Sequence, residues 1–406
     1  MKKSALVIAA RSISGLSGYL VLAIAANHLT AAQFAALSLL QTIIFLSQIV
    51  FDSGLTQLAT RENAGSPDWR LQASAYQNSR LTVHAGLAAL LMVFHAAGLI
   101  PTPTQGSWLP LVAALALLSN AFVLDWLLFA RQEQRLWAIK VLITAGSNVL
   151  ITAGLLIVFS RPEAVLAGVA LANLAGWIYL HTQGMTWQVR LAHPSRQTSK
   201  HALQLSLGAM LFHAAYNAPL LMATAMHAST SGAAFAILYR LFSAMTLFVP
   251  TLMEFAVARE VAALKKGESH GQLKVLFRLL TLSLLVCSPV IVMPSHHLHA
   301  TFALAIDLGK YQINPEDFNY IKVALLLFSV DYCSQRTAFV FDRRKLIIGS
   351  AVGGLLAAGA VLALTVNDLK AIEPVAWFHP LFTYQVTSAL LILANMTSLH
   401  RREIKQ

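Results

Sequence analysis

"RSISGLSGYLVLAIAANHLTAAQFAALSLLQTIIFLSQIVFDSGLTQLATRENA", residues 11–64, is the stretch of sequence that decides the fold. It contains two long apolar runs joined by a short turn, and its second run ends on Asp52 and then Arg61. Each run has the roughly 20 residues that a helix needs to cross about 30 Å of hydrocarbon. The stretch therefore predicts two successive membrane-spanning helices.

Similar apolar runs recur along the rest of the chain. The sequence is 57% hydrophobic and 11% charged, whereas soluble domains have roughly 45–50% apolar and 25% charged residues. We predict an all-α polytopic membrane protein with twelve transmembrane helices. The predicted spans are 5–27, 34–60, 81–100, 108–130, 138–159, 164–183, 203–226, 234–258, 276–294, 318–340, 346–366 and 375–397. Arg11 interrupts the first run, so we interpret that run as an uncleaved helix and not as a signal peptide.

Lysine and arginine are distributed unevenly along the loops. Because basic segments resist translocation, the more basic side is expected to be cytoplasmic. If the N-terminus is cytoplasmic, most basic residues fall in cytoplasmic segments. Among them are Arg61, Arg80, Arg131, Lys140, Arg259, Lys265, Arg343 and Arg401. The outside loops hold only Arg161, Lys310, Lys322 and Lys370. Twelve spans then place both termini in the cytoplasm, and the formal charge of +12 reflects topology and not a nucleic-acid partner.

The chain is expected to consist of two halves. The basic connection 184–202 contains Pro194 and divides the predicted helices into an N-terminal six-helix lobe, residues 1–190, and a C-terminal one, residues 191–406. Repeats in transporters leave polar residues at matching places in both halves. Arg11 and His213 are separated by the same number of positions as Asp52 and Glu254, and Asp125 and Asp331 by nearly the same number. We therefore predict two lobes around a central cavity.

Ionisable and polar residues inside the predicted spans mark the candidate site. A charge in hydrocarbon costs several kcal/mol unless it faces protein or water. Helical spacing places Arg11, Gln48 with Asp52, His213 with Asn217, and Arg240 with Glu254 on polar stripes of four helices. The alternative for Gln, Asn and His is bonding between helices, and for Arg11, Asp52 and Glu254 it is snorkelling to water. Arg240 and Glu254 lie too far apart along their helix to pair, and Asp331 and Arg336 lie on different sides of theirs, so partners are expected on other helices.

Other chemistry finds little support in the sequence. His296, His297 and His299 stand on one short segment without the spacing of a zinc motif, so we interpret them as interfacial and expect no metal. Cys287 and Cys333 lie in apolar runs, where a thiol behaves as a small hydrophobe. Neither a nucleophile elbow nor a phosphate loop is present, so we expect neither an enzyme nor a cofactor.

Three prolines lie inside predicted spans. Pro219, Pro250 and Pro289 each lack an N–H group and are expected to kink their helices. Such kinks suit moving parts, but static membrane helices also carry proline.

The order of these elements resembles the polysaccharide flippases of the multidrug/oligosaccharidyl-lipid/polysaccharide exporter superfamily. The resemblance rests on Arg11 with small residues after it, an aromatic Phe34 after a short turn, Asp52-x-Gly54, and then Arg61. In the second half, "SGAAFAILYRLF", "FALAIDLGKY" and "FDRRK" are similar as well. The chain departs from the family in the turn before the second helix, which lacks the usual Gly and Pro, and in Phe235, where Tyr is commoner.

The resemblance implies a flippase that moves polyprenyl-pyrophosphate-linked oligosaccharide across the bacterial inner membrane by alternating access, for surface polysaccharide biosynthesis. Candidate substrate-binding residues are Arg11, Gln48, His213, Asn217, Arg240 and Arg336. Candidate residues for coupling to a proton or sodium ion are Asp52, Asp125, Glu254 and Asp331. Membrane lipids, a glycan polymerase and chain-length machinery are the other implied partners.

Three alternatives remain open at this stage. A drug exporter of the same superfamily would favour an aromatic, acidic cavity over one containing Arg11 and Arg240. A major-facilitator transporter also has twelve helices, but "DSGLTQLATRENAG" lacks the Gly-Arg-Arg ending of its loop motif. The third alternative is a membrane scaffold for a glycan polymerase.

Overall fold

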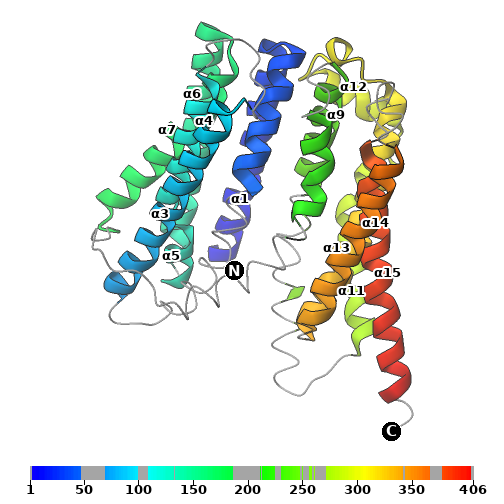
Figure 1. Cartoon of the computed structure of the whole chain (residues 1–406). Coiled ribbons are helices and arrows are strands. Elements are labelled where there is room, and N and C mark those ends of the chain that lie inside the picture. The colour runs from blue at the N-terminus through cyan, green and yellow to red at the C-terminus, as the bar shows by residue number, and fades with distance from the viewer. Residues whose placement is uncertain are drawn as a thin grey trace. The chain divides into compact units, whose positions relative to one another are not determined.

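The structure is a computed structural model. It describes residues 2–46, 69–98, 108–131, 133–185, 213–224, 230–246, 271–341, 343–365 and 377–403, together with a few isolated positions. The contacts divide the chain into two compact units (Figure 1). The first unit comprises Met1–Met210 with Thr224–Ala233, and the second comprises Leu211–Ala223 with Ala234–Gln406.

The first unit is a bundle of helices packed in a simple order. Its elements are α1 (Lys2–His28), a helix over Ala31–Leu46, α3 (Trp69–Ala96), α4 (Leu109–Ser119), the 3-10 turn η1 (Asn120–Phe122), α5 (Asp125–Ala130), α6 (Gln134–Phe159) and α7 (Pro162–Thr182). Helix α1 packs against α6, α6 against α7, α7 against α4, and α4 against α3. Neighbours in the bundle are therefore not always neighbours in the sequence.

The shortest helix of this unit lies in its core. Trp126, Leu127 and Leu128 of α5 are each 1% exposed. They belong to one buried cluster with Tyr76 of α3 and Trp137 of α6. Helix α5 is thus fixed by packing on several sides, although six residues alone would not hold a helix.

Helices α6 and α7 approach each other at two glycines. A Cβ atom at Gly168 would lie under 3.0 Å from the Thr152 hydroxyl, and one at Gly176 equally close to the Thr144 hydroxyl. Small residues allow membrane helices to pack this closely, with gains from van der Waals contact.

The second unit contains the remaining described helices, except that Thr224 and residues 230–233 belong to the first unit. These elements are a helix over residues 213–224, α9 (Thr230–Thr246), α11 (Gln272–Val292), α12 (Ser295–Ala303), the turns η2 (Gly309–Tyr311) and η3 (Pro315–Asp317), α13 (Phe318–Val340), α14 (Arg344–Thr365) and α15 (Phe378–Glu403). Helix α14 packs against α15, α15 against α13, and α13 against α11. The core of the second unit contains many aromatic rings. The ring centroids of Phe235 and Phe378 are 5.1 Å apart, and those of Tyr216 and Tyr384 are 5.5 Å apart.

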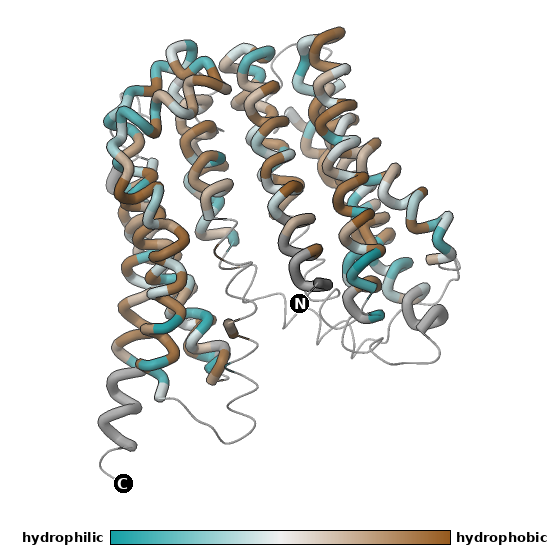
Figure 2. The backbone as a smooth tube through the Cα atoms, turned by 180° about the vertical axis from the view of Figure 1, so that it is seen from behind, coloured by the Kyte–Doolittle hydropathy of each residue, from teal (hydrophilic) through white to brown (hydrophobic). Residues whose placement is uncertain are grey.

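The chain is an all-α membrane protein. Among the described residues, six helices are long and apolar enough to cross a bilayer: Ser74–Ala96, Leu109–Leu128, Gln134–Phe159, Pro162–Thr182, Gln272–Val292 and Lys345–Ala363. Hydrophobic residues run along these helices in Figure 2. Leu150, Phe277 and Val292 are 75%, 65% and 78% exposed, which suits contact with acyl chains instead of water. The count of twelve spans and the position of the termini stay predictions.

Several predicted boundaries agree closely with the helices and others do not. The predicted span 318–340 coincides with α13 (Phe318–Val340). Helix α3 begins at Trp69, well before the predicted start at residue 81. The predicted span 108–130 is not one helix, because α4 ends at Ser119 and α5 begins at Asp125.

Two of the three prolines lie in described helices. Pro219 is in the helix over residues 213–224, Pro289 is inside α11, and Pro250 lies outside the described residues. Because Pro289 has no N–H group, the Leu285 carbonyl four residues earlier loses its usual helical donor. The Ser288 hydroxyl donates to that carbonyl at 2.9 Å. A neighbouring side chain thus satisfies the group that the proline leaves.

Replacing Ser288 by alanine is expected to lower the free energy of unfolding by about 1 kcal/mol, because the Leu285 carbonyl loses this donor. The melting temperature of the purified protein in detergent measures the loss. Ser288→Thr keeps the hydroxyl and is the matched control. A Ser288→Ala protein as stable as the Ser288→Thr protein would show that the hydroxyl does not compensate for Pro289.

Candidate functional site

The fourth predicted span is broken within the first unit. Helix α4 gives way to the turn η1, and Val123 has extended backbone angles, φ −79° and ψ 109°. After the break, the Leu127 N–H donates to the Leu124 carbonyl at 3.1 Å, as a new helix begins. The Asn120 carbonyl accepts from the Val123 N–H at 3.1 Å. Carbonyls at the break that have no such backbone donor need side-chain donors, since an unsatisfied carbonyl in hydrocarbon is costly.

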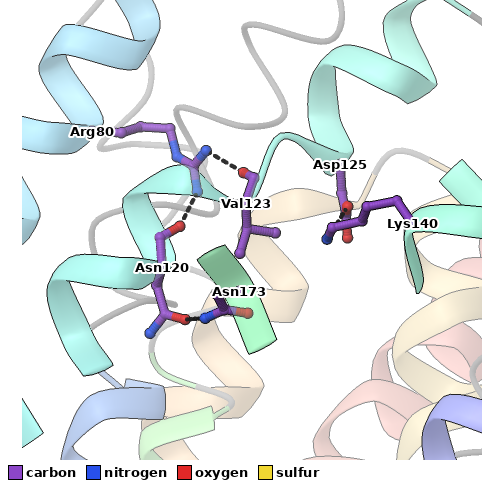
Figure 3. Close-up of polar contacts among 6 residues, drawn as sticks. All are labelled: Arg80, Asn120, Val123, Asp125, Lys140 and Asn173. Atoms are coloured by element: carbon purple, nitrogen blue, oxygen red, sulfur yellow. Dashed lines mark hydrogen bonds and ion pairs between the residues drawn. The ribbon is translucent and has the colours of Figure 1, made fainter. Parts of the chain in front are cut away.

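Side chains of α3 supply these donors (Figure 3). Arg80 donates through Nη1 to the Val123 carbonyl at 2.5 Å and through Nη2 to the Asn120 carbonyl at 3.1 Å. The Gln77 side-chain amide donates to the Ala121 carbonyl. Arg80 and Gln77 are 3% and 1% exposed. The structure thus places Arg80 in the core, where the sequence had indicated a cytoplasmic segment.

A third helix contacts the same break. Asn173 of α7 donates through Nδ2 to the Asn120 side-chain oxygen at 2.8 Å and to the Ser119 hydroxyl at 3.1 Å. Asn120 is therefore held through its side chain by α7 and through its main chain by α3. This arrangement fixes the end of α4 between two helices.

Asp125, at the start of α5, forms an ion pair. Lys140 of α6 lies with its Nζ 2.8 Å from the Asp125 Oδ1, and the two side chains are 5% and 34% exposed. The expectation that a buried charge finds its partner on another helix is met here, as Figure 3 shows. Lys140 was assigned to an inside segment, whereas it lies within α6 and is buried.

In the second unit, Asp331 is the centre of a polar network. It lies on α13 and is 0% exposed. Tyr216 donates its hydroxyl to Asp331 Oδ2 at 3.0 Å, and Gln335 donates its side-chain amide to Oδ1 at 3.0 Å. Gln385 of α15 donates to the Tyr216 hydroxyl at 3.2 Å. The donors to Asp331 are neutral, in contrast to the lysine that faces Asp125.

The structure also describes the candidate substrate-binding residues of the second unit. Arg336 stacks over the Tyr332 ring at 4.8 Å from its centroid, on the same helix α13. Asn217 donates to the His213 carbonyl at 2.8 Å, a bond within one helix. Arg240 lies on α9 and is partly buried. Each of these residues is therefore positioned, but none is shown to bind a substrate.

Four candidates stay predictions for a different reason. Arg11 lies on α1, but its side chain is outside the described part of the chain. Gln48, Asp52 and Glu254 lie outside the described residues altogether.

The histidine segment forms the short helix α12 and packs near the start of α13. His299 contacts the Ile313 carbonyl through Nε2 at 3.1 Å. Ser295 donates to the Asn319 side-chain oxygen at 2.6 Å. Within the described ranges, His, Cys, Asp and Glu form no group of three that would hold a metal ion.

Several polar residues of these networks were not singled out from the sequence. Arg80 follows the polar run "QNS" directly before an apolar run, and so resembled a loop residue. Gln335 lies one helical turn after Asp331, a spacing that does place both on one face. Tyr216 lies on the helix that carries His213 and Asn217, but a tyrosine in an apolar run gives no such signal.

The fold is that of a known class of transporters. An inward-facing multidrug resistance MATE family transporter of the MOP superfamily shares 12% identity, with a TM-score of 0.73 over 97% of this chain and 99% of that chain. An outward-facing one shares 14% identity, with a TM-score of 0.64 over 99% of both chains. At such identities the likeness shows the fold alone.

The sequence adds the particular family. The profile of the family described as "Polysaccharide biosynthesis protein" matches residues 1–259, more than half of the chain. The chain therefore belongs to the polysaccharide biosynthesis protein family, and the predicted resemblance is confirmed at this level. A comparison with curated protein sequences gives no match.

Proposed function

We propose that the chain is a flippase for polyprenyl-pyrophosphate-linked oligosaccharides in a bacterial inner membrane, acting in surface polysaccharide biosynthesis. The observation that carries this proposal is the match to the polysaccharide biosynthesis family on a chain with a transporter fold. Neither observation names the substrate. The substrate class follows from the chemistry that such a biosynthesis requires of a membrane protein.

The physical problem is to move a polar headgroup through hydrocarbon. The glycan and the pyrophosphate would lose their hydration in the bilayer core, at a cost of several kcal/mol for each unpaired polar group. A polar cavity between two six-helix lobes, residues 1–190 and 191–406, would shield them while the lipid tail stays in the bilayer. Rocking of the lobes would then expose the cavity to each side in turn. This proposal includes twelve spans and cytoplasmic termini.

The candidate residues have two roles in the proposed flippase. Guanidinium groups bind phosphate oxygens well, so Arg11, Arg240 and Arg336 would hold the pyrophosphate. Polar groups that would contact the glycan are Gln48, His213 and Asn217. Coupling to a proton or sodium ion would use Asp52, Asp125, Glu254 and Asp331.

Of the two candidate carboxylates that the structure describes, Asp125 and Asp331, the surroundings of Asp331 suit a proton better. Its donors Tyr216 and Gln335 are neutral, so neither of them balances a negative charge on Asp331. Asp125 instead pairs with the ammonium group of Lys140 at 2.8 Å. We therefore assign the coupling role first to Asp331.

Deleting the gene is the direct test of the flippase proposal. The lipid-linked oligosaccharide is expected to accumulate on the cytoplasmic leaflet, because its headgroup can no longer cross. Protection from an impermeant glycan-modifying reagent in oriented vesicles measures this accumulation, and the wild-type gene on a plasmid is expected to reverse it. Unchanged access of the lipid-linked oligosaccharide to the outer leaflet would contradict the proposal.

The double variant Arg240→Gln, Asp331→Asn separates transport from a scaffold role. A transporter with these changes is expected to insert normally but to leave the deletion phenotype uncorrected. Full correction by the double variant would favour the scaffold.

A further inference from the structure

We propose that Arg80 is a tethered cation that occupies a carbonyl site at the break between α4 and α5, and that it thereby positions Asp125 against Lys140. The inference concerns the first unit alone and does not depend on the substrate of the proposed flippase.

Two backbone carbonyls at the break face the same guanidinium group. Where a transporter helix is interrupted, its unwound backbone carbonyls are able to coordinate a cation. Here the carbonyls of Asn120 and Val123 both accept from one guanidinium group, at 3.1 Å and 2.5 Å. The rigid fork of arginine presents two nitrogens at a fixed spacing, whereas lysine presents a single ammonium group. The residue type thus matches a site with two acceptors.

The guanidinium group of Arg80 is a charge buried within the helix bundle. A charged side chain in the middle of a span costs several kcal/mol unless polar groups surround it. Arg80 is 3% exposed, and Gln77, which caps the Ala121 carbonyl, lies within 3.4 Å of the Arg80 Nη1 through its Oε1. The cation and the interrupted backbone therefore satisfy one another. Removal of the cation takes this donor from the Val123 carbonyl, whereas the Asn120 carbonyl still accepts from the Val123 N–H at 3.1 Å.

The backbone that Arg80 holds leads directly to the ion pair of Asp125 with Lys140. Val123 stands two residues before Asp125, and Asp125 is the first residue of α5. A bond that fixes the Val123 carbonyl therefore also fixes where α5 begins. Lys140 then reaches Asp125 from α6 at 2.8 Å, as seen in Figure 3. Arg80 acts on this pair through the backbone and from a different helix.

A double-mutant cycle tests the coupling. We expect Arg80→Ala to lower the melting temperature of the purified full chain by about 5 °C or more. Lys140→Met is expected to lower it further in the wild-type background than in the Arg80→Ala background, because without Arg80 the pair is no longer in place. Side chains that act independently would give additive losses. Additive losses would therefore overturn the positioning role.

The control for the cycle is Arg135. It lies on the same helix as Lys140 and is exposed. The losses caused by Arg135→Ala and Lys140→Met are expected to add. An equally strong coupling with Arg135 would show a general effect of charge, and would also overturn the inference.

Chemical rescue tests the carbonyl site itself. Millimolar guanidinium chloride is expected to raise the melting temperature of Arg80→Ala toward that of the wild type, while sodium chloride at the same concentration does not. Wild type and Arg135→Ala are expected to show no gain. An absent rescue, or an equal effect of both salts, would overturn the tethered-cation site. If Arg80→Ala does not fold, Arg80→Lys is expected to be more stable than Arg80→Gln, and equal stability of these two would overturn it.

Discussion

Asp331→Asn is expected to abolish the acceleration of oligosaccharide flipping by a proton gradient while leaving the chain folded. Asparagine has the size of aspartate and keeps one acceptor oxygen for the Gln335 amide, while its own amide nitrogen can donate to the Tyr216 hydroxyl oxygen, which has lone pairs. It cannot take up or release a proton. If Asp331 carries the coupling proton, the gradient-dependent part of the flipping rate is lost completely, and only the gradient-independent part remains.

Flipping of the lipid-linked oligosaccharide by the purified protein in vesicles, with and without an imposed proton gradient, measures this effect. Asp331→Glu keeps a titratable group and is expected to retain part of the response. Asn395→Ala, an exposed change on α15, is the matched control and is expected to respond like the wild type. A full response by Asp331→Asn would remove Asp331 from the coupling pathway without affecting the proposed substrate.

Gly168→Ala is expected to lower the free energy of unfolding by about 1–3 kcal/mol, the usual cost of overpacking a well-packed interior. The new Cβ would lie under 3.0 Å from the Thr152 hydroxyl and 3.3 Å from the Thr152 Cα, so α6 and α7 must separate. The melting temperature in detergent measures the loss.

Two comparisons make the glycine prediction specific. Gly154, on the facing helix α6, has no atom within 4 Å of an added Cβ. Because alanine is the better helix former, Gly154→Ala is expected to be neutral or stabilising. Adding Thr152→Ala to Gly168→Ala is expected to recover part of the stability, since it removes the clashing hydroxyl. Equal stability of the two glycine variants would contradict the close approach of α6 and α7.

The fold was largely predictable, because hydropathy and helix length constrain a membrane protein strongly. The span 318–340 matches α13 (Phe318–Val340), since charged residues bound it on both sides. The prediction was wrong at the start of α3 and in the middle of the span 108–130. Both errors have one cause. Arg80 looks like a loop residue until the interrupted backbone that accepts its hydrogen bonds is known, and that interruption has no clear signature in the sequence.

The candidate site was predictable only in part. The cost of an intramembrane charge singled out Asp125 and Asp331 without any structure. Their partners were harder to identify, because Tyr216 lies 115 positions from Asp331 and carries no formal charge. Lys140 was recognised as a charged residue, but the prediction placed it in a cytoplasmic segment. A charge in a membrane sequence therefore indicates one residue of an interacting pair, and the structure is needed to identify the residue that it contacts.

The glycine contacts between α6 and α7 also constrain the route of a lipid substrate. Where Gly168 and Gly176 face Thr152 and Thr144, an added methyl group would lie under 3.0 Å from a threonine hydroxyl. A polyprenyl tail is much wider than a methyl group and cannot lie in this seam. In the proposed flippase the lipid tail must therefore lie elsewhere than between α6 and α7 at these two glycines.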